Sequence, residues 1–79
     1  MRILFFGHLR DVTRCARMEV HFDESADADA VWRKLIESHP ALARFHGCVR
    51  LARNCEYAGA DARFADADEV ALIPPVSGG

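Results

Sequence analysis

Apolar residues along the chain fall into short runs whose spacing predicts a small fold of strands and one main helix. Residues 3–6 and 70–73 are continuously apolar, which indicates strands covered on both faces. Residues 18–22 alternate between apolar and polar side chains, which indicates a half-buried strand that pairs back on the first. Two shorter strands are expected at residues 49–52 and 56–58.

The main helix is expected to begin after Asp27, whose carboxylate is suited to cap the first turn. The apolar residues that follow recur with the helical period, at i, i+3, i+4, i+7 and i+8: Ala28, Val31, Trp32, Leu35 and Ile36. This stripe assigns Trp32 to the core. Pro40 ends the helix, and a further short helical turn is expected over residues 42–45. Residues 8–14 are predicted to form one more helical turn.

The order of these elements, β-β-α-β-β, predicts an α+β fold in which a mixed sheet packs on one main helix. The most apolar strands, residues 3–6 and 70–73, are expected at the centre of the sheet. This is the β-grasp, or ubiquitin-like, architecture. One helix covers only one sheet face, and an exposed apolar patch on the other face would mark a protein interface. The alternative is that residues 42–45 and Phe64 fold over that face.

Length and composition allow one domain and exclude several classes of partner. The 79 residues, of which 51% are hydrophobic, suffice for one modest core. The net charge of −2, with acidic and basic residues interspersed, predicts no nucleic-acid partner and no membrane partner. No apolar run is long enough for a membrane span or a signal peptide, and the three cysteines form no Cys-x-x-Cys pair, so we expect a cytoplasmic protein. We expect a domain over residues 1–75 and an extended, flexible tail over residues 76–79.

The remaining reactive side chains predict no metal site and no catalytic triad. Ligand spacing is absent among the histidines and cysteines, which are His8, His21, His39, His46, Cys15, Cys48 and Cys55. An acidic cluster before the last strand comprises Asp61, Asp66, Asp68 and Glu69. We expect it to be a solvated edge, and the alternative is that it steers docking onto a basic partner.

Gly78 and Gly79, at the end of the printed sequence, carry the strongest indication of chemistry. Without Cβ atoms they form a slim backbone that fits a tunnel too narrow for side chains. Pro74 and Pro75 lack N–H donors and stiffen the approach to them. The reactive group of such a tail is its α-carboxylate, which can be activated as an acyl-adenylate and converted to a thioester, an amide or a thiocarboxylate. A frayed terminus is the alternative, because chain ends are commonly disordered.

Residues 66–79 resemble the signature of the small subunit of molybdopterin synthase. That family ends in D-G-D-E-V-A, two hydrophobic residues and P-P-V-[ST]-G-G, and this chain ends in DADEVALIPPVSGG. Residues 3–10 are similar to the family's first strand and arginine-bearing turn, and residues 52–57 to its A-V-N segment and short strand. Ala67 stands for the turn glycine, at a cost of about 1 kcal/mol if the turn requires a positive φ. Arg53 stands for an apolar residue and is expected to point outward or to pair with an acid.

The resemblance implies a sulfur carrier that binds no cofactor and supplies no catalytic side chain. An E1-like enzyme uses ATP to adenylate the carboxylate of Gly79, and sulfur from a persulfide then replaces the adenylate to leave a thiocarboxylate. The carrier docks on the large catalytic subunit, and Gly78 gives the tail a slim approach to the active site. There the sulfur passes to cyclic pyranopterin monophosphate and builds the dithiolene of molybdopterin. The residues implied to contact the partner are Phe6, Arg10, Ile73, Pro74, Pro75, Val76 and Ser77.

Two other functions stay open at the level of sequence. One is a different β-grasp sulfur carrier, of the thiamine or tRNA-thiolation type, although the Pro-Pro-Val-Ser approach favours the molybdopterin type. The other is a ubiquitin-like modifier joined to lysines through Gly79, or a plain interaction module that works without its tail.

Overall fold

The computed structural model describes residues 1–59 and 61–74. Its elements, in chain order, are β1 (Arg2–Phe5), α1 (Leu9–Thr13), β2 (Arg17–Glu19), α2 (Ala28–Ser38), the 3₁₀ helix η1 (Pro40–Phe45), β3 (Arg50–Arg53), β4 (Glu56–Tyr57) and β5 (Glu69–Ile73). No helix in this described part of the chain is long and apolar enough to cross a membrane. The predicted tail over residues 76–79 lies outside the described residues, so the division of the chain at residue 75 stays a prediction.

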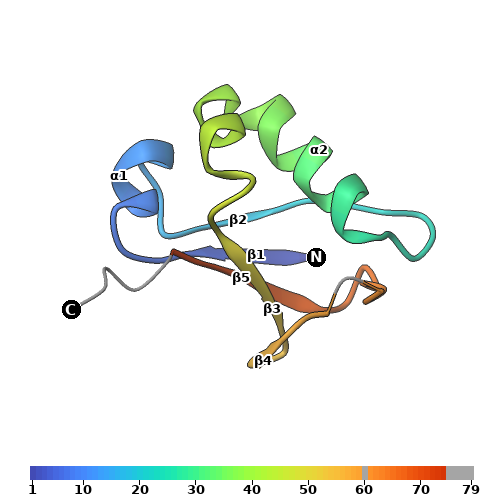
Figure 1. Ribbon diagram of the computed structural model, residues 1–79. Coiled ribbons are helices and arrows are strands. Elements are labelled where there is room, and N and C mark those ends of the chain that lie inside the picture. Colours follow the sequence, from blue (N-terminus) through green and yellow to red (C-terminus); the bar gives the residue numbers. More distant parts are fainter. Residues whose placement is uncertain (60, 75–79) are drawn as a thin grey trace.

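The strands form one five-stranded mixed sheet in the order β2-β1-β5-β3-β4. β1 and β5 run parallel, while β1–β2, β3–β5 and β3–β4 are antiparallel. The first and last strands therefore lie inside the sheet, as their continuous apolar runs predicted. Figure 1 shows α1, η1 and α2 together on one side of the sheet. This confirms the predicted β-grasp architecture.

Helix α2 follows the predicted pattern closely. The carboxylate of Asp27 accepts a hydrogen bond from the Ala30 N–H at 2.8 Å, which caps the first turn. Val31, Trp32 and Leu35 are buried, so the apolar stripe faces the sheet. The helix ends at Ser38, just before Pro40 opens η1.

The core lies between the helices and one face of the sheet. Ile3 and Phe5 of β1 and Val70 and Leu72 of β5 are buried against the helices, because strands point alternate side chains to one face. Two further members of this core are Leu42 and Phe64. Leu42 belongs to η1, which packs on α1 and α2, and the backbone of Phe64 pairs with Ala26 just before α2. The alternative cover for the opposite sheet face is therefore wrong: these segments lie on the helical side.

The bounds of all five strands differ from the predicted ones by at least one residue, and two of these differences are informative. β1 ends at Phe5 rather than at Phe6, because Gly7 has a φ of 59° and turns the chain toward α1. β2 spans Arg17–Glu19, whereas the alternation predicted residues 18–22. The cause is non-local: the Phe22 N–H donates to the carboxylate of Asp66 at 2.9 Å instead of to a neighbouring strand.

Candidate functional site

The ends of β1 and β5 lie side by side because the two strands are parallel neighbours. The chain leaves β1 through Phe6 and Gly7, and it leaves β5 through Ile73 and Pro74. A Cβ atom on Gly7 would lie only 3.2 Å from Cγ of Pro74, which places the base of the tail directly against this turn. Phe6, Ile73 and Pro74, three of the residues expected to bind a partner, therefore share one end of the sheet.

The sheet face opposite the helices carries an apolar groove of about 300 Å³. Its centre is a row of cross-strand neighbours, since Ala71 pairs with Leu4 on one side and with Ala52 on the other, and Ala52 pairs with Tyr57. The apolar lining consists of Leu4, Phe6, Ala52, Tyr57, Ala71 and Ile73. The register thus aligns residues of four strands and of the turn after β1 so that they form one continuous patch.

The groove keeps large aromatic surface in contact with solvent. Phe6 is 45% exposed and Tyr57 is 58% exposed, which makes them the exposed large hydrophobic residues within residues 1–59 and 61–74. The guanidinium of Arg50 lies 4.2 Å from the centre of the Tyr57 ring, which holds this ring in a cation–π contact at the rim. Exposed apolar patches on small domains are typical of surfaces that bind other molecules.

Arg10, the other residue expected to bind a partner, lies on α1 and does not line this groove. It borders a separate polar hollow of about 460 Å³ together with Gly7, Asp11, Arg14, Cys15 and Ala16. Gly7 belongs to this hollow and also touches Pro74, so the two surfaces adjoin at the base of the tail. The positions expected to enter the partner itself lie outside the described residues: Pro75, Val76, Ser77, Gly78 and Gly79.

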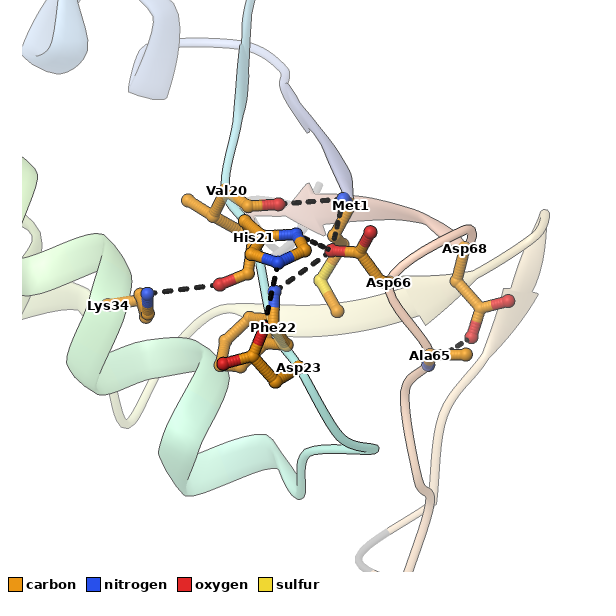
Figure 2. A network of polar contacts seen from close by, with 9 residues as sticks. All are labelled: Met1, Val20, His21, Phe22, Asp23, Lys34, Ala65, Asp66 and Asp68. Carbon is orange, nitrogen blue, oxygen red and sulfur yellow. Dashed lines mark hydrogen bonds and ion pairs between the residues drawn. The ribbon is translucent and has the colours of Figure 1, made fainter.

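Asp66, from the acidic turn before β5, braces the fold at the opposite end of the sheet (Figure 2). Its Oδ1 accepts hydrogen bonds from the Phe22 N–H at 2.9 Å and from the amino group of Met1 at 3.4 Å. His21 Nδ1 lies 3.1 Å from the same oxygen. The Phe22 N–H, helped by the Met1 amino group and His21, holds the pKa of the Asp66 carboxyl below its ordinary value.

Asp68 stabilises the same turn from within. It accepts hydrogen bonds from the Ala65 N–H at 2.8 Å and from the Asn54 side-chain amide at 3.2 Å, which hold the pKa of its carboxyl below the ordinary value. Ala67 is not among the described residues with a positive φ, so alanine replaces the family's glycine there without left-handed strain. Arg53 is exposed, in agreement with the expected outward-pointing side chain, and its guanidinium donates a hydrogen bond to the carbonyl of Arg63.

No three His, Cys, Asp or Glu side chains within residues 1–59 and 61–74 come together as a metal site would require. The three cysteines are free thiols.

Comparison with known proteins agrees with this geometry. A family model described as "ThiS family" matches residues 3–79, which is nearly the whole chain. The chain belongs to the ThiS family. The matched range includes the last strand and the Gly-Gly end as well as the β-grasp domain.

Relatives of this ThiS-family chain are similar over its full length. It is 32% identical to a protein of Caenorhabditis elegans named molybdopterin synthase sulfur carrier subunit, covering all of this chain and 96% of that protein. It is 30% identical to the Arabidopsis thaliana protein of the same name, covering 82% of that protein. Among solved structures, the crystal structure of SAMP1 from Haloferax volcanii is similar with a TM-score of 0.85 and 32% identity, covering all of this chain and 98% of the other.

Sequence reasoning found the ends of the groove and missed its middle. Phe6 and Ile73 were expected from the family resemblance, whereas Leu4, Ala52 and Tyr57 were not. The positions in β1 and β5 carry a usable signal, since residues that alternate with buried ones must face the uncovered side. Tyr57 gave no such signal, because its place depends on how the two-residue strand β4 pairs with β3.

Proposed function

We propose that this ThiS-family chain is the sulfur carrier subunit of a molybdopterin synthase. The observation that carries the proposal is that the tail-bearing strand β5 runs through the uncovered apolar face and ends beside Phe6. A partner that covers this face also receives the chain that continues beyond Pro74. The full-length similarity to two proteins named molybdopterin synthase sulfur carrier subunit supports this choice over a general interaction module.

Docking through the groove would set the direction of the tail. Leu4, Ala71 and Ile73 lie on strands whose register is fixed by the core on the other side of the sheet, so the groove is a rigid platform. The contact of Pro74 with Gly7 fixes where the chain leaves this platform. Residues 75–79 can then reach at most about 18 Å beyond Pro74, at about 3.3–3.6 Å per residue. The reaction centre of each partner must lie within that distance of the docked sheet.

The reaction in this proposal takes place at the carboxylate of Gly79. An E1-like enzyme transfers AMP from ATP to this carboxylate, and pyrophosphate leaves. The terminal sulfur of a persulfide donor then attacks the acyl-adenylate and displaces AMP to give an acyl disulfide. A thiol attacks the donor's own sulfur in this acyl disulfide, which releases the thiocarboxylate and leaves the donor and the thiol joined in a disulfide. In the large subunit, the thiocarboxylate gives its sulfur to cyclic pyranopterin monophosphate. The catalytic side chains belong to the large subunit, and burial of the tail there keeps water from the activated carbonyl.

A second function, protein modification, is favoured by one specific observation. The similar Haloferax volcanii protein is named small archaeal modifier protein 1. The same activated carboxylate would form an amide if a lysine amine, rather than a persulfide, displaced AMP. Isopeptide-linked Gly79 on other proteins would identify this function, and the identity of a co-purifying partner would separate the molybdopterin type from the thiamine and tRNA-thiolation types of carrier.

The direct test of sulfur loading is intact-mass spectrometry after incubation with the E1-like enzyme, ATP and a persulfide donor. We expect a mass gain equal to one sulfur-for-oxygen exchange, and we expect none in a variant that lacks Gly79. The deletion variant should keep its fold, because the core is built from residues up to Leu72. Loading of the deletion variant, or no loading of the wild-type chain by an enzyme that is active on another carrier, would contradict the proposal.

A further inference from the structure

Four arginines lie at the end of the sheet from which the tail leaves. Arg10 on α1 and Arg14 just after it border the same hollow as Gly7, beside the base of the tail. Arg17 begins β2 and Arg50 begins β3. Because β2 and β3 run antiparallel to β1 and β5, their first residues lie where the central strands end, as the α1 side of Figure 1 illustrates.

These four side chains are exposed, and none has an ionic partner within the described residues 1–59 and 61–74. Arg50 stacks on the Tyr57 ring of the groove, and Asp11 is the acid among the residues that line the hollow. Arg10 and Arg14 border one hollow, so their like charges repel one another, and no ion pair within the described residues offsets the charge of any of the four arginines. This uncompensated positive charge on the surface therefore favours binding of a ligand with negative charge.

Acidic side chains of β2, of β5 and of the turn before β5 lie at the other end of the sheet. Glu69 opens β5 and pairs with Arg2 at 3.0 Å, and Glu19 closes β2. Asp66 and Asp68 accept hydrogen bonds within the turn before β5. Although the net charge is only −2, the charges are distributed unevenly along the sheet. The unpaired arginines lie at the end from which the tail leaves, and the acidic side chains lie at the other end. Of the acidic cluster, Asp66, Asp68 and Glu69 are engaged within the fold, whereas whether the cluster steers docking stays a prediction.

We propose that the arginine end is a docking surface for acidic side chains that surround the tail entrance on the partner protein. This inference rests on the proposed function and names the chemistry of the partner's surface. Guanidinium groups bind carboxylates through two parallel hydrogen bonds, which fix orientation as well as position. The separation of basic and acidic side chains along the sheet would also orient the carrier so that its tail faces the partner during association, because complementary electrostatic potentials guide two proteins as they approach.

Arginines also bind phosphates, but the surroundings favour a protein here. The basic end adjoins the apolar groove, because Arg50 pairs with Ile73 across the sheet and its guanidinium lies over the Tyr57 ring, and both Ile73 and Tyr57 line the groove. A protein face can match apolar and charged areas together, whereas nucleic-acid backbones offer no apolar surface of this kind. The acidic far end of the sheet would moreover repel an extended phosphate chain.

The test is the salt dependence of the association rate with the large subunit, measured by stopped-flow fluorescence for charge-reversal variants. Arg17→Glu and Arg10→Glu, singly and together, place the change at the tail end, while Arg33→Glu makes the same change on the exposed face of α2. At low salt we expect the double variant to associate at least about tenfold more slowly than wild type, with the difference shrinking in high salt. Arg33→Glu should stay within about twofold of wild type, and Arg17→Lys should retain the wild-type rate, because steering depends on charge.

The outcomes separate the two claims. Equal slowing by Arg33→Glu and the tail-end variants, or rates that do not depend on salt, would overturn the inference and leave the proposed function intact. Binding of a single-stranded DNA oligonucleotide that is lost in Arg10→Glu/Arg17→Glu would overturn it in favour of a phosphate ligand. Wild-type chain that binds neither the large subunit nor the activating enzyme would overturn both claims. Thermal melting of each variant shows that slower association is not caused by unfolding.

Discussion

Pro74 packs against the backbone of Gly7, and a Cβ atom at Gly7 would come within 3.2 Å of the Pro74 ring. This contact joins the turn after β1 to the point where the tail leaves β5. It requires a residue without a side chain in a left-handed conformation, since Gly7 has a φ of 59°.

Gly7→Ala should therefore destabilise the domain by about 1–2 kcal/mol, from left-handed strain together with the crowded Pro74 ring. Urea unfolding measures the change. Gly47→Ala is the matched control, because a Cβ there meets nothing within 4 Å, and it should change stability by at most about 0.5 kcal/mol. Equal effects of the two substitutions would show that the Pro74 contact carries no strain.

Cys55→Gly should raise stability. Asn54 and Cys55 have φ angles of 49° and 75° and form the two-residue turn between β3 and β4, where the second position favours glycine. Relief of the left-handed strain is worth about 1 kcal/mol, or a rise of about 4–8 °C in Tm for a domain of this size. Cys48→Gly, at an exposed cysteine that is not among the positive-φ residues, should bring no gain. A rise of Tm in both variants would mean that loss of a thiol, rather than backbone relief, is responsible.

Adjacent phenylalanines should separate folding from docking. Phe5 is fully buried in the core, so Phe5→Ala should cost about 3–5 kcal/mol of unfolding free energy. Phe6 is 45% exposed in the groove, so Phe6→Ala should leave the melting temperature nearly unchanged and weaken binding to the large subunit. Titration calorimetry and thermal melting test the pair. A Phe6→Ala variant that binds as tightly as wild type would remove the groove from the interface.

Acid stability should depend on the turn before β5. The pKa of Asp68 is lowered in the fold, so its carboxylate contributes stability that is fully present above the ordinary value of 3.8 and is lost as pH falls through the lowered folded-state pKa. Asp68→Asn should therefore be less stable than wild type at neutral pH and should lose less stability on acidification. Glu37→Gln is the control, since Glu37 is exposed on α2 and has no hydrogen-bond partner among the described residues. Parallel pH profiles for wild type and Asp68→Asn would contradict this role of the turn.

Much of the fold could be predicted from local pattern. Helix α2 and the two central strands have strong signals, because their apolar periods and the Asp27 cap are properties of contiguous residues. The end of β2 could not be predicted, since it depends on the register in which Glu19 pairs with Arg2, and the Phe22 N–H beyond it is bound by the Asp66 carboxylate 44 residues away along the chain. Local alternation carries no information about such a partner.

The candidate site, like the fold, could be predicted only in part. The tail chemistry and the residues Phe6 and Ile73 follow from recognisable sequence motifs. The groove between them depends on the register that aligns Leu4, Ala71 and Ala52, and the arginine end depends on antiparallel strands that bring Arg17 to the end of β1. Register and strand order are properties of the assembled sheet, so single-sequence patterns do not specify them.

The central claim is that this chain delivers sulfur to a pterin. The most direct measurement is a reconstitution with the large subunit and cyclic pyranopterin monophosphate, in which the carrier is loaded with isotope-labelled sulfur and the product is followed by mass spectrometry. The account predicts that labelled sulfur appears in molybdopterin while the carrier returns to its unmodified mass. Loaded carrier that keeps its label in the presence of a large subunit active with another carrier would contradict the account.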